Sequence, residues 1–266
     1  MQLALFRWGG VVIVLLPYIY YKKDILLKAM QKNFLIIFTL GALGIAGFNT
    51  FLFYGLQDTT ATNALLINSS IPILIIALSA IVNSERVTLL QLFGIVLSTL
   101  GVMFLVIKGD FSNIVKLEFN KGDFWIIVSS FDWAFYSILL KYKPKDLKPF
   151  EFISAITLLG FIVLIAVYFV TGHGLTASSF ELRKEVYFAI LFMIFFPSLL
   201  SFYFWNRGVL EIGPNKTGQF THLMPIFGAF LAYIFLDEVL ELYHVYGIVL
   251  IGLGIYLSIF LKKGKA

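Results

Sequence analysis

Cysteine is absent from this chain of 266 residues, and charge is scarce, because Asp, Glu, Lys and Arg make up only 13% of it. Without cysteine the chain has no disulfide framework, no thiolate metal site and no thiol nucleophile. A water-soluble protein of this size needs roughly a quarter of its residues charged to cover its exterior. Apolar residues instead make up 60% of the chain, and the mean hydropathy is +0.92. These values exclude a soluble enzyme and a disordered protein, and they predict a chain embedded in the lipid bilayer.

Signals for nucleic acids, metals and cofactors are equally sparse. The 20 Lys and Arg residues outnumber the 15 Asp and Glu residues, but they lie between apolar runs rather than along one stripe. The sequence contains no H-E-x-x-H motif and no glycine-rich phosphate loop. We therefore expect no nucleic-acid partner, no metal and no cofactor.

Nine apolar runs are long enough to cross a bilayer, whose hydrocarbon core of about 30 Å needs ~20 helical residues. They fall at roughly 3–20, 34–56, 61–82, 88–107, 124–140, 151–171, 186–206, 217–236 and 243–261. None shows the alternation of a barrel strand, and a continuous apolar segment in lipid must be helical. The sequence thus predicts an all-α integral membrane protein with nine transmembrane helices and only short connections.

The positively charged residues predict the orientation of these helices. If the nine spans alternate in direction, fourteen Lys and Arg residues fall on the side of the C-terminus and five on the other side. Cytoplasmic loops are enriched in these residues, so the C-terminus is expected in the cytoplasm. The expected membrane is the plasma (inner) membrane. Residues 262–266 would form a basic cytoplasmic tail, and residues 108–123 a linker outside the cytoplasm.

The two halves of the chain repeat each other at an offset of 153 residues. The offset places Pro72 on Pro225, Glu85 on Glu238, Gly94 on Gly247 and Gly101 on Gly254. A second repeat at 124–261 would hold five helices, and a first repeat at 1–107 only four, lacking its first helix. Five is an odd number, so complete repeats would be inverted in the membrane relative to each other.

Several of these segments resemble a known family. Pro225 to Gly254 reads P-x12-E-x8-G-x6-G, and it follows the segment Ser201 to Asn206, S-F-Y-F-W-N. Together they closely resemble the second repeat of EamA-type permeases of the drug/metabolite transporter superfamily. F-R-W at 6–8 and W-A-F-Y at 133–136 resemble the same family's second and sixth helices. The resemblance implies two inverted five-helix repeats with a substrate cavity between them.

Polar residues accompany the two equivalent prolines, which are helix kinks by this interpretation. One turn before Pro72 and Pro225 the chain carries Asn68 and Thr221, followed by Ser69 and His222. A kink that frees backbone carbonyls beside polar side chains is how transporters build binding sites near the middle of the bilayer. A bend with only a structural role is the alternative.

A second group of candidate substrate-binding residues lies on polar and aromatic stripes of two other spans. Helical spacing places Ser129, Asp132, Trp133 and Tyr136 on one broad face, and a similar face carries Ser201 and Trp205. Asp132 lies mid-span, where facing lipid would cost about 2.5–3.5 kcal/mol, so we expect it to point into the bundle. Asp132 and His222 are candidates for proton coupling, and interhelical hydrogen bonding is the alternative for both.

Two pairs of glycines predict close helix packing. Gly94 with Gly101, and Gly247 with Gly254, are seven residues apart and so share a helix face. This packing could occur within one chain or between two chains of a homodimer.

The sequence as a whole indicates a permease that moves a small metabolite, amino-acid-like or otherwise amphipathic, by alternating access. Export is expected only because it is common in the family that the chain resembles. One alternative is a truncated or non-transporting membrane subunit. A membrane enzyme is another, disfavoured because no nucleophile, metal set or phosphate loop accompanies the buried polar residues.

Overall fold

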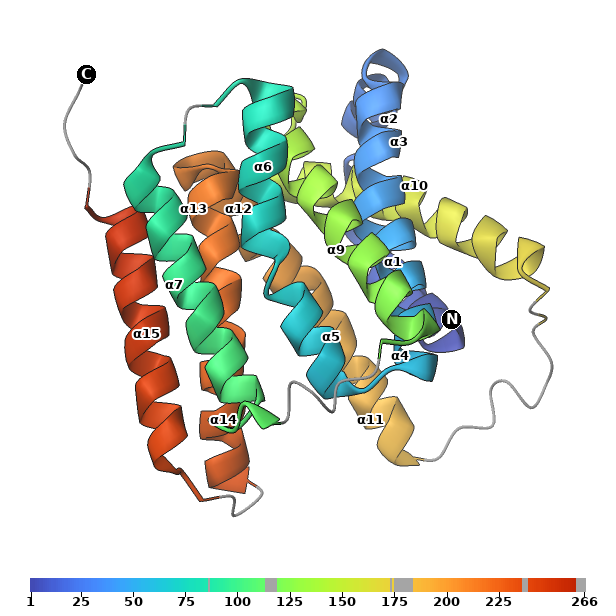
Figure 1. Cartoon of the computed structure of the whole chain (residues 1–266). Helices are drawn as coiled ribbons and strands as arrows, with labels where there is room; N and C mark the ends of the chain where they lie inside the picture. Colours follow the sequence, from blue (N-terminus) through green and yellow to red (C-terminus); the bar gives the residue numbers. More distant parts are fainter. Residues whose placement is uncertain (86, 113–118, 173, 175–183, 236–238, 262–266) are drawn as a thin grey trace. The chain divides into compact units, whose positions relative to one another are not determined.

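Figure 1 shows the computed structural model of the protein, which describes residues 1–85, 87–112, 119–172, 174, 184–235 and 239–261. All regular elements of these residues are helices, which confirms the all-α fold class. Glu238, the basic tail at 262–266 and part of the predicted linker, 113–118, lie outside the described residues.

Nine helical stretches of the described residues are long and apolar enough to cross a membrane, as predicted. They are Gln2–Tyr21, Phe34–Asp58, Ala61–Asn83, Leu89–Val106, Lys121–Tyr142, Pro149–Val170, Val186–Ile212, Pro214–Phe235 and Leu242–Ile259. The seventh stretch ends later than expected, because apolar Val209, Leu210 and Ile212 extend the helix to Gly213. Gly213 has φ 87°, a left-handed conformation that glycine adopts readily, and the eighth stretch begins directly after it.

The helices form two compact units, each of which draws on both predicted repeats. Unit 1 comprises residues 1–54 and 135–211, and unit 2 comprises residues 55–134 and 212–266. Helices α4 (Phe48–Asp58) and α9 (Lys121–Leu139) each run from one unit into the other. Unit 1 otherwise contains α1 (Gln2–Tyr21), α2 (Lys23–Lys32), α3 (Phe34–Gly41), η1 (Ala42–Gly47), η2 (Leu140–Tyr142), α10 (Pro149–Val170), α11 (Lys184–Met193), η4 (Ile194–Leu200) and α12 (Ser201–Ile212) except its last residue. Unit 2 contains α5 (Ala61–Asn68), α6 (Ile71–Asn83), α7 (Leu89–Val106), α13 (Pro214–Gln219), η5 (Phe220–Leu223), α14 (Met224–Phe235) and α15 (Leu242–Ile259).

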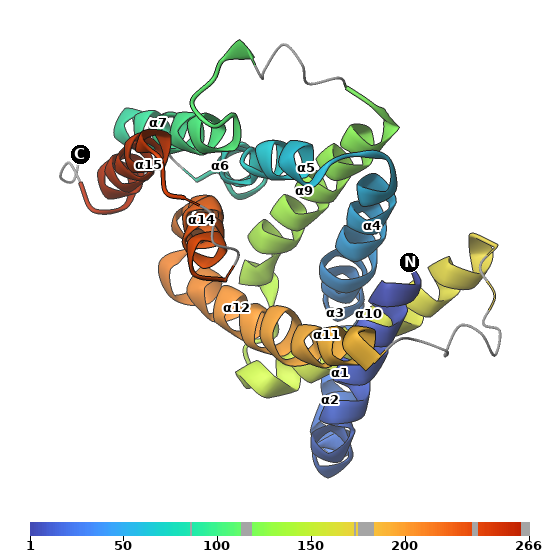
Figure 2. The same ribbon diagram turned by 90° about the horizontal axis from the view of Figure 1, so that it is seen from below.

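In unit 1, α10 packs against α1 and against α3 with η1, an arrangement that Figure 2 shows from below. Two glycines, Gly41 and Gly160, lie where α10 meets α3. A Cβ atom on Gly160 would lie 2.5 Å from the carbonyl oxygen of Gly41, and one on Gly41 would lie 2.6 Å from that of Ile156. Any larger residue at either position would push these helices apart.

In unit 2, α7 and α15 lie side by side along their whole length (Figure 1). The four glycines singled out in the sequence lie at this contact. A Cβ atom on Gly94 would lie 2.5 Å from the carbonyl oxygen of Gly254, and one on Gly247 would lie 3.2 Å from that of Gly101. These glycines therefore bring two helices of the same chain together. The 153-residue offset maps Gly94 onto Gly247 and Gly101 onto Gly254. It therefore maps the contact between Gly94 and Gly254 onto the contact between Gly247 and Gly101, as expected for two helices related by a two-fold axis.

Irregular backbone also recurs at this offset. The π-helical segment η1 covers Ala42–Gly47, and a second π-helical segment, η4, covers Ile194–Leu200, which includes the equivalent residues 195–200. The break between α5 and α6 at Ser69 and Ser70 corresponds to residues 222 and 223 in η5, which separates α13 from α14. Each half therefore carries the same two departures from α-helical geometry.

The sequence predicted that the two prolines kink continuous helices. In the structure each proline instead lies at the start of a separate helix. Pro72 is the second residue of α6, and Pro225 is the second residue of α14. Proline lacks a backbone N–H, and at the first turn of a helix that N–H would have no partner within the helix. Both prolines therefore follow an interruption of the span and fit the new helix without losing a hydrogen bond.

The outer faces of the helices are apolar. On α15 the exposed residues Val245, Val249, Leu253 and Tyr256 follow one another at spacings of three or four and form a continuous stripe. Exposed apolar stripes of this kind are unfavourable in water, and the hydrocarbon core of a bilayer accommodates them.

Candidate functional site

Polar side chains meet inside the spans of each unit. In unit 1 the central one is Arg7, on the first two turns of α1. Its Nε donates to Ser198 Oγ at 2.5 Å, one Nη donates to the Pro197 carbonyl at 3.1 Å, and the other Nη donates to Asn49 Oδ1 at 3.3 Å. The guanidinium also lies 5.4 Å from the ring centroid of Trp8. All four neighbours are neutral, and among the described residues no carboxylate pairs with Arg7.

The π-helical segment η4 supplies two of these acceptors. Pro197 has no N–H to donate to a preceding carbonyl, and Ser198 Oγ donates instead to the Met193 carbonyl at 2.7 Å. A π-helical turn displaces its carbonyl groups from the regular α-helical hydrogen-bond pattern. The Pro197 carbonyl oxygen can therefore accept a hydrogen bond from Arg7. On the other side, Asn49 Nδ2 donates to the Ile45 carbonyl at 2.7 Å and so fixes its Oδ1 toward Arg7. Residues 45 and 198 are themselves equivalent under the 153-residue offset.

The C-terminal part of α9 joins α12 through two adjacent hydrogen bonds. Tyr136 donates from its hydroxyl to Asn206 Oδ1 at 2.6 Å, and Trp205 Nε1 donates to Ser137 Oγ at 3.2 Å. Asn206 is 4% exposed, and its Nδ2 has no hydrogen-bond partner among the described residues.

Aromatic rings link this pair of helices to α1. The ring of Phe202 lies 5.8 Å from that of Tyr136 and 5.1 Å from that of Trp8, between centroids. A row of packed rings thus connects Asn206 with the surroundings of Arg7 inside unit 1.

In unit 2 the equivalent residues 69 and 222 are in contact. His222 is 1% exposed, with Nε2 2.9 Å from the Ser69 carbonyl and Nδ1 2.7 Å from Ser98 Oγ. The Ser69 carbonyl is available because the helix breaks at Ser69 and Ser70. The histidine therefore ties the interrupted third span to α7 from within η5.

Other predicted site residues of unit 2 bond either to a neighbouring helix or to a carbonyl three residues earlier in the chain. Ser130 donates from Oγ to Asn68 Oδ1 at 2.9 Å, which links α9 to α5. Ser129 donates to the Ile126 carbonyl of α9, and Thr221 in η5 donates to the Gly218 carbonyl of α13. Asp132 is 8% exposed, and Trp133 beside it is half-buried.

The structure thus brings some of the predicted residues together and leaves others apart. Ser69 meets His222, while Tyr136 and Trp205 take part in adjacent pairs. Ser201 is exposed and donates to the Phe196 carbonyl of its own helix. The predicted set omitted Asn49 and Asn206, although an asparagine within an apolar span is itself a signal, since a buried amide needs partners.

Comparisons with known proteins agree with this architecture. A profile of the EamA-like transporter family matches residues 1–107 and 120–260. The chain belongs to this family. The uncharacterized transporter YyaM of Bacillus subtilis (strain 168) is 31% identical over 252 residues, covering 95% of this chain and 82% of YyaM. An uncharacterized transporter of Archaeoglobus fulgidus is 28% identical over 268 residues, covering 97% of this chain and 86% of its own.

A solved crystal structure shares the fold of this EamA-like protein, with a TM-score of 0.72 over 98% of this chain and 86% of its own, at 16% identity. Family membership and the nine apolar helices identify the chain as a multi-pass integral membrane protein that transports a small solute.

Proposed function

We propose that the protein exports a small metabolite that carries a carboxylate, such as an amino acid or a related amphipathic acid, from the cytoplasm across the plasma membrane. The observation that carries this proposal is Arg7, a cation inside a span whose partners among the described residues are all neutral. A charge in a span is costly, and such residues often mark a substrate path.

Arg7 retains the means to bind an anion. A guanidinium has five N–H donors, and three of them are used by Ser198, Pro197 and Asn49. Two donors remain for a solute carboxylate, whose negative charge would also compensate the buried cation. The neutral acceptors hold the guanidinium in place before the solute arrives, which lowers the entropic cost of binding.

Alternating access between two inverted repeats is the mechanism that we propose. The helix break, the π-helical segment and the glycine contacts all recur at one offset, which supports descent from a duplicated unit. Transporters built from inverted repeats bind substrate near the middle of the bilayer, at interrupted helices. Asn68, Ser69, Thr221 and His222 at the two breaks, with Ser129, Trp133, Tyr136, Ser201 and Trp205, remain the candidate lining of that path, and Asp132 remains the candidate for proton coupling.

Transport by purified protein in proteoliposomes, measured with a panel of amino acids, other small carboxylates, nucleobases and sugars, tests the proposal. We expect saturable transport of a carboxylate solute. Arg7→Gln should raise its KM about tenfold or more, because a charge-assisted hydrogen bond contributes about 1.5–3 kcal/mol. Arg7→Lys should fall between Arg7→Gln and the wild type, since lysine keeps the charge and loses the bidentate geometry.

Lys28→Gln is the matched control, because Lys28 is an exposed cation of the same unit on α2. It should transport like the wild type. Preference for an uncharged solute, or an Arg7→Gln variant with wild-type KM, would overturn the assignment of a carboxylate.

A further inference from the structure

Unit 1 contains a pocket of about 320 Å³ near the junction of α9 and α10. Its wall comes from the connection between these helices, the first turns of α10 and the second half of α12. The lining residues are Lys143, Pro149, Phe152, Ile153, Tyr203, Asn206, Arg207, Leu210 and Glu211. This volume lies at the small end of the range of roughly 300–1,000 Å³ that is typical of ligand sites.

The most buried polar residue of the pocket lining is Asn206. The Tyr136 hydroxyl donates to its Oδ1 at 2.6 Å, which fixes the amide and leaves Nδ2 without a hydrogen-bond partner among the described residues. Asn206 is 4% exposed. A buried amide donor without a partner is destabilising, and an acceptor on a bound ligand would supply the missing hydrogen bond.

Lys143 supplies a positive charge at the same pocket. Its Nζ donates to the Pro144 carbonyl at 3.0 Å and to the Leu147 carbonyl at 2.6 Å, and it lies 5.4 Å from the ring centroid of Phe152. An ammonium group has three donors, so one remains after these two bonds.

Charged neighbours leave Lys143 available to an anion. Asp146 and Glu151 act on it electrostatically but do not line the pocket. The Glu151 carboxylate already accepts the Lys148 backbone N–H at 2.8 Å. Burial lowers the pKa of Lys143 from its usual value, and these two carboxylates oppose that shift.

Arg207 and Glu211 form the rim. Arg207 Nε lies 2.6 Å from Glu211 Oε1 in an exposed ion pair. The charged lining residues are therefore two cations and one carboxylate, and that carboxylate is already paired. Phe152 and Ile153, which are 1% and 3% exposed, give the pocket an apolar floor.

We propose that this pocket is a loading site for the transported solute, and that it binds a small carboxylate with an apolar portion. The carboxylate would accept from Asn206 Nδ2 and Lys143 Nζ while the apolar portion contacts Phe152 and Ile153. This inference rests on the proposed function, because it gives the carboxylate solute a second binding site in unit 1, besides Arg7. Packed aromatic rings connect this pocket with the surroundings of Arg7, in the order Tyr136, Phe202 and Trp8.

The test measures binding to the purified full-length protein in detergent by titration calorimetry. The probes are acetate, butyrate, phenylacetate, L-leucine and L-phenylalanine, each compared with the amide of the same acid. We expect at least one carboxylate with an apolar portion to bind more tightly than its amide. Lys143→Gln and Asn206→Asp should each weaken that binding about tenfold, which corresponds to the loss of one charge-assisted hydrogen bond.

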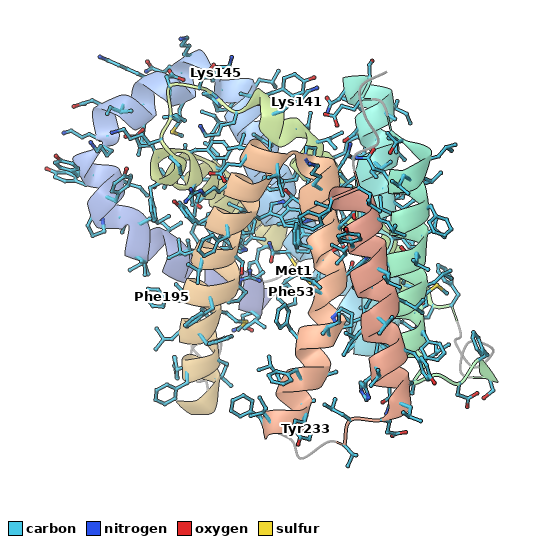
Figure 3. All side chains as sticks on the ribbon, turned by 90° about the vertical axis from the view of Figure 1, so that its left-hand side faces the viewer. Met1, Phe53, Lys141, Lys145, Phe195 and Tyr233 are labelled. Atoms are coloured by element: carbon cyan, nitrogen blue, oxygen red, sulfur yellow. The ribbon has the colours of Figure 1, made fainter. Side chains whose placement is uncertain are left out.

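The variants are chosen so that folding does not confuse the result. Asn206→Asp keeps an oxygen for the Tyr136 hydroxyl while replacing the Nδ2 donor with a negative oxygen. Lys145→Gln is the matched control, because Lys145 is an exposed lysine of the same connection (Figure 3), and it is not among the residues that line the pocket. Its affinity should stay within about twofold of the wild type.

The two proposals can fail separately. If the wild type transports a carboxylate but Lys143→Gln and Asn206→Asp bind it normally, the pocket is not a loading site, and the proposed function stands. If no probe binds in preference to its amide, the pocket proposal is also wrong. If carboxylates bind and depend on both residues but no solute is transported, the binding site stands and the export function falls.

Discussion

Several buried polar residues in this protein form hydrogen bonds between helices. His222 illustrates this, because both of its ring nitrogens are engaged, one by the Ser69 carbonyl and the other by Ser98 Oγ. A proton-coupling histidine must exchange a proton with a solvent path, whereas His222 is 1% exposed and held on both sides. The described contacts therefore favour the structural alternative for this residue.

Ser98→Ala should accordingly lower the thermal stability of the purified protein without changing the pH dependence of transport. Removing one partner of a buried hydrogen bond costs about 1–3 kcal/mol, because the imidazole nitrogen is left unsatisfied. In a double-mutant cycle with His222→Leu the two losses should be non-additive, as expected for residues in contact. Thermal unfolding in detergent and transport at several pH values provide the measurements.

Ser79→Ala is the control for this pair. Ser79 and Ser98 are both 0% exposed in unit 2, but Ser79 Oγ has no hydrogen-bond partner among the described residues. Replacing an unsatisfied hydroxyl with a methyl group should leave the stability unchanged or raise it. A His222→Leu variant that keeps its stability but loses the pH dependence of transport would instead support proton coupling.

Whole elements depend on glycine where helices meet closely. Gly254→Ala should destabilise the protein by about 1–3 kcal/mol, because overpacking a tight contact forces the helices to shift. The added Cβ atom would lie 2.5 Å from the backbone nitrogen of Ser98 and would also meet the Gly94 carbonyl, and backbone atoms cannot rotate away. The midpoint of thermal unfolding measures the effect.

Gly252→Ala on the same helix should be neutral or stabilising. A Cβ atom at Gly252 would meet nothing within 4 Å, and alanine is the better helix former by roughly 1 kcal/mol. Equal losses of stability in both variants would show that the α7–α15 contact is not the cause.

The elements also show what could be predicted from the sequence. Span positions follow from runs of about 20 apolar residues, and this signal depends on composition alone, so all nine spans were predicted. The glycine positions were predictable because a seven-residue spacing places them on one helix face. The π-helical segments were not predicted. A π-helical turn shifts the backbone hydrogen bond by one residue, and this shift depends on packing and, in η4, on Pro197. The apolar composition of these segments does not indicate it.

The candidate site was predicted less completely than the spans. Sequence reasoning found residues capable of binding but not their partners, as Tyr136 with Asn206 and Ser69 with His222 show. Partners on other helices depend on rotations about each helix axis, which are set by packing across the whole unit. The Lys143 pocket was missed for the same reason, since its lining comes from two segments that lie 50 or more residues apart in the chain.

At the scale of the whole molecule, the function depends on which side of the membrane each loop faces. The Lys-rich connection between α9 and α10 is expected in the cytoplasm, because Lys and Arg are retained on that side. The loop after α7, which contains exposed Phe111, is expected outside. If this orientation holds, the pocket at Lys143 opens toward the compartment from which an exporter takes its solute.

The absence of cysteine makes this orientation directly measurable, because a single introduced thiol has no background. In intact cells a membrane-impermeant maleimide should label Phe111→Cys, and it should label Lys145→Cys only after the cells are permeabilised. The one span between these positions, Lys121–Tyr142, requires them to lie on opposite sides. Labelling of both in intact cells would contradict that span. The reverse pattern would place the Lys143 pocket outside the cell, where a solute-loading site would serve uptake and the proposal of export would be wrong.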